Sequence, residues 1–400
     1  MINLEDNGIH ELTKKIAELV EKFGEIEIEG TEISADELTF LLQPTVQTAI
    51  QRQLPVNKTA DKPLGFISTK FTQPIEEFPG QVVEMQIGAT KKEGGTRGNV
   101  LKIGGHKTMP FYSFESINPN RPVFAMDVFD MPITLAKPVK QAVAEVMDDP
   151  AEWAKKCVNE FGAQMVSFNL VSTDPLLEDR PTEQAVKAVE KVLEAVDVPI
   201  IVGGSGNREK DPLVLEAAAK IAHGERIILN SVSVDMDNKR VVKAAKEHGH
   251  SVVAFTPMDV NNQKRLNRIL LDEGLPKNQI VQDPTTAALG YGLEYAFSLE
   301  ERIKLAGLMG DEDLQMPIMA AASNAWGARE AWMKNEEWGP REIRGPLWET
   351  VTCISLMMAG ADLFMISHPA TVRIAQKLAA SLYGENKISQ EIENWITNIK

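Results

Sequence analysis

The chain has 400 residues, of which 57 are acidic and 42 basic, giving a formal net charge of −15. No basic excess is available to replace the counterions of a nucleic acid or of an anionic membrane, which argues against a general binder of either. Apolar residues make up 43% of the chain and charged residues 25%, a composition typical of a globular protein with a sizeable core. The length suits one large domain with an appendage as well as two equal halves.

The two cysteines, Cys157 and Cys353, lie in helix-like stretches far apart in the sequence. They indicate neither a disulfide framework nor a thiolate metal site, and they favour a reducing compartment. The acidic start MINLEDNGIH lacks the apolar core of a signal peptide, and no run approaches the ~18 apolar residues that span a bilayer. We therefore expect a cytoplasmic protein without a membrane segment.

Residues 1–80 are expected to form a separate N-terminal extension. Helical periodicity in ELTKKIAELVEKF, the alternating EIEIEG and a following Gln- and Pro-containing stretch suggest a small α+β module with a linker. Residues 81–121 are expected to form a hairpin, in which VVEMQIGA and NVLKIGG flank the turn-rich TKKEGGTRG. Such a hairpin could plug the N-terminal face of the domain that follows.

From residue 122 to 400 one pattern repeats, a short apolar run followed by an amphipathic helix. The runs are PVFAMDV (122–128), AQMVSFNL (163–170), PIIVGGSG (199–206), RIILNSVSV (226–234), SVVAFTPMDV (251–260), IVQDPTT (280–286), PIMAAASNAW (317–326) and ADLFMISHP (361–369). Their apolar content does not alternate, as expected for parallel strands that are covered on both faces. Eight strand–helix repeats predict a (β/α)₈ TIM barrel rather than an open doubly wound sheet.

The segments between the runs have helical stripes of apolar residues, such as Val189, Val192, Leu193 and Val196. Pro212 directly after Asp211 marks one helix start. The barrel assignment therefore rests on both halves of the repeat.

The stretch GGSGNREK after the third run raises the question of a phosphate loop. A dinucleotide fingerprint that starts from Gly204 and Gly206 needs a third glycine where Glu209 stands, and the Gly-Lys-Ser/Thr ending of a P-loop is absent. We expect a tight loop on the functional face of the barrel, because active sites of this fold lie at the carboxyl ends of the strands.

Residues at these carboxyl ends are dominated by Asn, Ser and Thr, which donate and accept hydrogen bonds without being strong bases or metal ligands. They are Asp127, Asn169, Ser172, Asp174, Gly203, Gly204, Ser205, Asn230, Ser231, Thr256, Asp259, Asp283, Thr285, Ser323, Asn324, Ser367 and His368. No lysine ends a strand and no pair of histidines has zincin spacing, so Schiff-base chemistry and a protein-only metal site are disfavoured. A lyase or an aldolase on this fold is disfavoured for the same reason.

Asp283 and His368 are the rim residues with acid–base potential. Each has a structural alternative, since Asp283 before Pro284 favours a turn and His368 before Pro369 can cap the last helix. Four tryptophans, Trp326, Trp332, Trp338 and Trp348, follow the seventh run; they could cover a ligand or partner, or pack in the core.

Several stretches resemble a known family. GATKKEGGTRG, IGGHKTMPFYSFE, NRPVFAMDV, DPTTAALGYGLEYAFSLEERI and RGPLWETVT are similar to the delta subunits of archaeal acetyl-CoA decarbonylase/synthase complexes, which are homologues of the small subunit of the bacterial corrinoid iron-sulfur protein. The likeness runs from about residue 82 to the end of the chain. It implies a barrel related to pterin-dependent methyltransferases and a role in one-carbon metabolism.

The resemblance implies a heterodimer with a larger gamma subunit that carries the corrinoid and a four-iron cluster. The pair would move a methyl group between a methylated pterin and the acetyl-CoA synthase/CO dehydrogenase subunits. Two separated cysteines cannot hold a four-iron cluster, so no Fe-S cluster is expected on this chain. The alternative is a pterin-dependent methyltransferase acting in its own right.

The rim would cover the corrinoid (cobamide) at the interface with the gamma subunit. The residues expected to contact the cofactor are Asn169, Ser172, Gly203, Gly204, Ser205, Gly206, Asn230, Thr256, Asp283, Asn324, Ser367 and His368. No residue is predicted to be catalytic. Related barrels bind pterins through Asp and Asn, which here would be Asp283 with Asn230 or Asn324.

Overall fold

The computed structural model describes residues 72–384 and residue 396, so that residues 1–71 of the predicted N-terminal extension (1–80) lie outside the described residues. By contacts, the chain divides into two units, 1–71 and 72–400. The strands of the second unit are β1 Glu84–Ile87, β2 Leu101–Gly104, β3 Val123–Phe129, β4 Met165–Asn169, β5 Ile200–Gly203, β6 Ile228–Val232, β7 Ser251–Phe255, β8 Ile280–Asp283, β9 Met319–Ala321 and β10 Leu363–Ile366. Its α-helices are α2 Lys137–Val143, α3 Pro150–Asn159, α4 Thr182–Ala195, α5 Asp211–Ile221, α6 Asn238–His248, α7 Val260–Asp272, α8 Leu293–Leu308, α9 Arg329–Trp332, α10 Arg341–Ala359 and α11 Pro369–Leu382.

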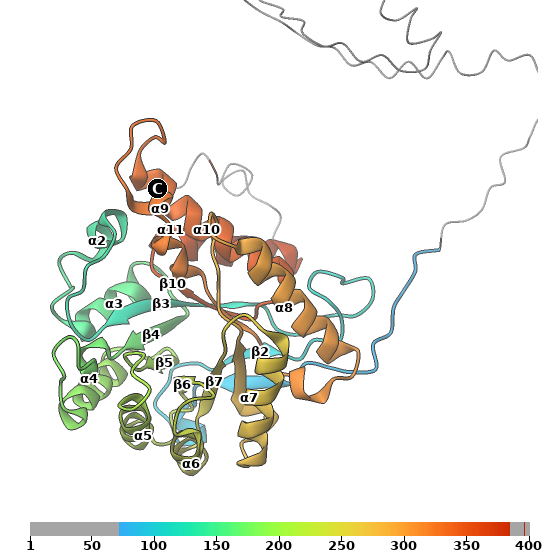
Figure 1. Cartoon of the computed structure of the whole chain (residues 1–400), viewed down its shortest axis with the longest axis horizontal. Coiled ribbons are helices and arrows are strands. Elements are labelled where there is room, and N and C mark those ends of the chain that lie inside the picture. Colours follow the sequence, from blue (N-terminus) through green and yellow to red (C-terminus); the bar gives the residue numbers. More distant parts are fainter. Residues whose placement is uncertain (1–71, 385–395, 397–400) are drawn as a thin grey trace, which may run out of the picture. The chain divides into compact units, whose positions relative to one another are not determined.

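Short 3₁₀ helices complete the description: η1 Lys91–Glu93, η2 Val171–Thr173, η3 Lys277–Gln279, η4 Glu312–Leu314 and η5 Ala322–Gly327. Strands β3 to β10 form one eight-stranded parallel sheet in the order β8-β7-β6-β5-β4-β3-β10-β9. A parallel bridge between Gln282 and Ile318 joins the two end strands and closes the sheet into a barrel. Figure 1 shows the helices outside the strands. The predicted (β/α)₈ barrel is confirmed, and each of the eight apolar runs contains one strand.

Strands β1 and β2 pair as an antiparallel hairpin before the barrel. Three hairpin side chains, Met85, Ile87 and Ile103, are fully buried against apolar residues from the barrel interior. The partners on the strands are Val123, Ala125, Met165, Ile201, Ile228, Val253, Val281, Met319 and Leu363. Several of these are the first residues of their strands, so the hairpin closes the N-terminal face of the barrel and leaves the carboxyl ends open.

The loop of the hairpin is fixed to the barrel by Arg97, whose side chain is almost fully buried. Its guanidinium donates to the carbonyl oxygens of Val196 (2.6 Å), Val198 (3.2 Å) and Leu193 (2.8 Å), and its Nε lies 2.8 Å from a carboxylate oxygen of Glu225. A planar fork with several fixed donors satisfies carbonyls at different positions at once, which lysine cannot do. The stretch GGTRG therefore has a structural role at the closed face.

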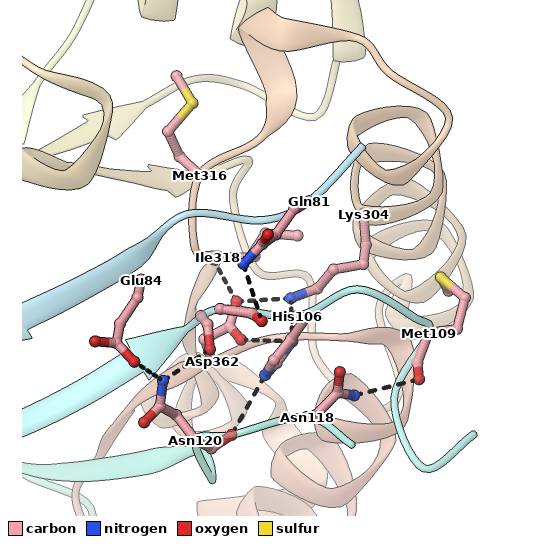
Figure 2. Close-up of polar contacts among 12 residues, drawn as sticks. Gln81, Glu84, His106, Met109, Asn118, Asn120, Lys304, Met316, Ile318 and Asp362 are labelled. Atoms are coloured by element: carbon pink, nitrogen blue, oxygen red, sulfur yellow. Dashed lines mark hydrogen bonds and ion pairs between the residues drawn. The ribbon is translucent and has the colours of Figure 1, made fainter. Parts of the chain in front are cut away.

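A buried polar cluster joins the hairpin segment to the barrel (Figure 2). Nζ of Lys304, on α8, lies 2.8 Å from Oδ2 of Asp362 and 3.1 Å from Nδ1 of His106. Burial lowers the pKa of His106 to about 4, so the ring is neutral; Nε2 faces the carbonyl of Asn120 at 3.3 Å. Asp362 Oδ2 also accepts from the amide of Ile318 at 2.9 Å. Each charge is thus paired and hydrogen-bonded, as burial requires.

Candidate functional site

A cavity of about 580 Å³ opens at the carboxyl ends of the barrel strands. Its walls come from the loops after β5 and β6, from the ends of β7 to β10 and from the first half of α7. This volume lies in the range of pockets that hold small organic ligands. Because the hairpin covers the opposite face, this is the open end of the barrel at which a site of this fold is expected.

Four of the twelve residues predicted to contact the cofactor line the cavity: Gly206, Asn230, Asp283 and Asn324. Ser231, which was also expected at a strand end, lines it too. The amide of Asn324 donates to the carbonyl of Thr286 at 2.9 Å, and the amide nitrogen of Asn230 lies 4.0 Å from the sulfur of Met365 across the barrel. The cavity thus presents one carboxyl and two amides, groups that can pair with the donors and acceptors of a polar heterocycle.

Asp283 is the acid–base residue of the cavity. Burial raises its pKa to about 7, and the amide of Thr285, which donates to Oδ1 at 2.9 Å, lowers it only in part. This carboxyl can therefore exist in either protonation state near neutral pH. The turn suggested by Pro284 is also present, so the structural and functional interpretations of Asp283 are compatible.

Thr285 has a positive φ of 72°, an uncommon conformation for a β-branched residue. Its hydroxyl donates to the carbonyl of Thr256 at 2.7 Å and holds this conformation. Strained backbone of this kind persists where the surrounding structure fixes it and is found more often at functional sites. Here it fixes the turn that holds the Asp283 carboxyl.

The Gly-rich loop after β5 uses its polar groups internally. The carboxylate of Asp211 accepts from the amides of Ser205 (2.9 Å) and Gly206 (2.8 Å) and from the Ser205 hydroxyl (3.0 Å). A Cβ on Gly204 would lie 2.4 Å from the same carboxyl, so this position requires glycine. These amides are already taken by a side chain of the protein, which confirms that the loop is not a phosphate cradle.

A second buried carboxyl, Asp127, lies at the carboxyl end of β3. Burial raises its pKa to about 6, and the hydroxyl of Ser367 donates to Oδ2 at 3.0 Å. The turn after β10 is held by Glu349, whose carboxylate accepts from the amides of Ser367 (2.7 Å) and His368 (3.0 Å). Neither Asp127 nor Glu349 lines the cavity. Their hydrogen bonds hold the turn after β10 in place.

His368 is the N-cap of α11, where its Nδ1 accepts from the amide of Ala370 at 3.2 Å. Burial lowers its pKa to about 4, and its ring lies 6.0 Å from that of Trp326. The structure therefore does not bring His368 and Asp283 together in the cavity. The capping interpretation of His368 is confirmed.

The other eight residues predicted to contact the cofactor lie outside the cavity lining. Ser172 bonds through its amide (2.9 Å) and its hydroxyl to the carboxylate of Asp130, and the Thr256 hydroxyl donates to Gln263 at 2.8 Å. Asn169 donates to the carbonyl of Ser167 at 3.2 Å. Gly203, Gly204, Ser205 and Ser367 contribute to the loops described above. Contact of any of the twelve residues with a cofactor stays a prediction.

The cavity also has charged side chains that the predicted strand ends did not include. Arg208, Asp235 and Arg265 line it in addition to Asp211 and Asp283. Arg208 and Asp235 lie in the loops after β5 and β6, and Arg265 lies on α7, so strand ends alone could not reveal them. The sequence offered one signal for Arg265. Asn262 and Arg265 are three residues apart, and residues three apart share one helix face.

The tryptophan-rich segment after β9 forms a second hollow. Arg344 anchors the segment by donating to the carbonyls of Gly339 (2.6 Å), Met333 (2.6 Å) and Glu330, and it lies 5.4 Å from the centre of the Trp338 ring. Together with Trp348, these side chains line a hollow of about 580 Å³. The segment is thus ordered by one arginine and exposes aromatic surface.

Both cysteines are buried and free, and within residues 72–384 no group of three or more His, Cys, Asp or Glu side chains is arranged to hold a metal ion. None of the helices in this part of the chain is long and apolar enough to cross a membrane. The cavity itself is lined by amide, carboxyl and guanidinium groups.

Fold and cavity define a (β/α)₈-barrel protein with a polar, ligand-sized site at the carboxyl ends of its strands. A dihydropteroate synthase from Xanthomonas albilineans, solved with 4-aminobenzoic acid, is 17% identical, covers 66% of this chain and 94% of its own, and has a TM-score of 0.47. The strand order described above establishes the fold without this likeness.

Sequence relatives identify the family. The acetyl-CoA decarbonylase/synthase complex subunit delta of Archaeoglobus fulgidus is 49% identical over 356 residues, 86% of this chain and 79% of that protein. The subunit of the same name from Methanocaldococcus jannaschii is 45% identical over 393 residues, 96% of each chain. A family model for the CO dehydrogenase/acetyl-CoA synthase delta subunit matches residues 84–336. The chain belongs to this family, as its motifs indicated.

Proposed function

We propose that this chain is the small subunit of a heterodimer whose larger gamma subunit carries a corrinoid and an iron–sulfur cluster. Its open face covers the corrinoid, and the pair transfers methyl groups between a methylated pterin and the acetyl-CoA synthase subunits of the complex. When bound, the corrinoid supplies the metal centre that accepts and passes on the methyl group. The barrel shields that centre from water and positions its periphery.

One observation carries this proposal. The open face combines a polar cavity mouth with the absence, among the described residues, of an available strong metal ligand. The rim imidazole of His368 caps a helix, and Cys157 and Cys353 are both buried. Such a face can bond to the amide arms of a corrinoid without competing for its metal. A cavity of about 580 Å³ is too small for the whole macrocycle, which would lie across the mouth.

Co-expression with the gamma subunit tests the pairing. We expect a stable heterodimer that retains corrinoid during size-exclusion chromatography, and a chain that stays alone would contradict the proposal. Asn230→Ala and Asn324→Ala should leave the heterodimer intact, because neither side chain supports the barrel core. If either variant abolishes methyl transfer while the heterodimer persists, the barrel takes a direct part in the reaction.

The cavity favours a second candidate function, a pterin-dependent methyltransferase acting in its own right. Asp283, Asn230 and Asn324 line an enclosed space of the size that a bicyclic heterocycle needs, and a carboxyl that ionises near neutral pH can pair with two adjacent N–H groups. Methylation of free corrinoid by a methylated pterin, with this chain and without the gamma subunit, would establish this function. Absence of that activity would leave the heterodimer as the unit of function.

A further inference from the structure

One cation at the cavity mouth has no partner in the part of the chain that the structure describes. Arg265 lies on α7, five residues after its start at Val260, and is exposed to solvent at the wall of the cavity. The structure records neither an ion pair nor a hydrogen bond of its guanidinium with any residue of the described part of the chain. Asn262, on the same helix face, lines the same wall.

The carboxyls of the same cavity have partners other than Arg265 or are partly protonated. Asp235 pairs with Arg208 at 3.0 Å, which bridges the loops after β5 and β6. Asp211 accepts three hydrogen bonds from its own loop, and burial raises the pKa of Asp283 to about 7, so its charge is partial at neutral pH. At the mouth, Arg265 is therefore the arginine whose guanidinium has no recorded ion-pair partner among the described residues, while Arg208 is paired with Asp235.

We propose that the barrel cavity binds a small molecule with an anionic group, and that Arg265 selects for this group at the mouth while Asp283 and Asn230 bind the uncharged head below. The anion is a carboxylate or a phosphate, because both accept two parallel hydrogen bonds from a guanidinium. The choice of a pterin as the uncharged head rests on the proposed function, whereas the binding of an anionic group by Arg265 does not.

The chain provides a matched control for Arg265. Arg268 lies one turn further along α7, is equally exposed, and pairs with Asp313 away from the cavity. Replacing either arginine by glutamine removes one exposed positive charge from the same helix. The two variants therefore differ in position relative to the cavity and not in net charge.

Three probes test the proposal by titration calorimetry with the full-length chain: methyltetrahydrofolate, which carries carboxylates, methyltetrahydromethanopterin, which carries a phosphate, and dimethyltetrahydropterin, which has no anionic tail. We expect at least one tailed probe to bind about tenfold more tightly than the tailless one, with a preference that salt weakens. Arg265→Gln should remove the preference, and Arg268→Gln should retain it. Because the tail of methyltetrahydromethanopterin carries carboxylates as well as a phosphate, competition by inorganic phosphate and by glutarate distinguishes the two anions.

Equal binding of all three probes, a preference that survives in Arg265→Gln, or no binding of any probe would each overturn the proposal. These outcomes can be distinguished from a failure of the proposed heterodimer. Co-purification of Arg265→Gln with the gamma subunit and its corrinoid is measured independently. A heterodimer that forms while tail selection is absent overturns the role of Arg265 alone.

Discussion

The ionisation of Asp283 links the site to the stability of the barrel. Burial raises the pKa of this carboxyl from 3.8 to about 7, so the folded chain holds this proton more tightly than the unfolded chain. Between these two pKa values the folded state binds more protons. The Asp283 contribution to the free energy of unfolding is therefore most favourable at about pH 4 and falls as the pH rises through 7.

Asp283→Asn should remove this contribution while keeping an acceptor for the amide of Thr285. Relative to the wild type, the variant should gain about 2 kcal/mol of stability between about pH 5 and pH 8. Urea unfolding at several pH values measures the gain. Burial also raises the pKa values of Asp127 and Glu349, so the difference between the two proteins isolates Asp283. If the free energies of unfolding of the wild type and the variant changed in parallel over this pH range, Asp283 would be ionised in the folded chain throughout it.

The buried cluster of Lys304, Asp362 and His106 joins the hairpin segment to the barrel. Lys304→Met should lower the free energy of unfolding by about 3–5 kcal/mol, because the fully buried carboxylate of Asp362 loses its counter-charge. Chemical denaturation measures the loss. Lys277→Met is the control, since the Lys277 ion pair with Glu312 is exposed at the surface and should contribute less than about 1 kcal/mol. Equal losses in the two variants would contradict the account.

The tryptophan-rich segment depends on Arg344 in a similar way. Arg344→Lys keeps the charge and loses the fork that reaches the carbonyls of Glu330, Met333 and Gly339. We expect faster hydrogen exchange across residues 329–340, with exchange in β3 to β10 unchanged. Unchanged exchange in the segment would show that packing of the tryptophans, rather than Arg344, orders it.

The sequence was sufficient to predict the barrel and its open face, because strands buried on both sides leave continuous apolar runs and polar residues directly follow them. It was not sufficient to predict the cavity. Arg265 reaches the cavity from a helix, which depends on side-chain direction rather than on position along a strand. Asp211 shows the same limit: the helix start was predicted, but its bonds to Ser205 and Gly206 were not.

At the scale of the whole molecule, the two ends of the barrel differ in kind. The hairpin, Arg97 and Lys304 seal the N-terminal face with apolar contacts and buried ion pairs, while the opposite face keeps a polar cavity and exposed aromatic side chains. In the proposed heterodimer, the gamma subunit would therefore approach the barrel from the carboxyl ends of its strands. Loss of the hairpin seal should lower stability without removing the docking face.

Hydrogen–deuterium exchange on the heterodimer with the gamma subunit tests this central claim most directly. Binding should protect the loops at the carboxyl ends of the strands, residues 204–210, 233–237 and 323–340, and leave the hairpin loop at residues 88–98 unchanged. Protection confined to the hairpin side, or none on either face when the two chains are mixed, would contradict the claim that this barrel covers the corrinoid with its open end.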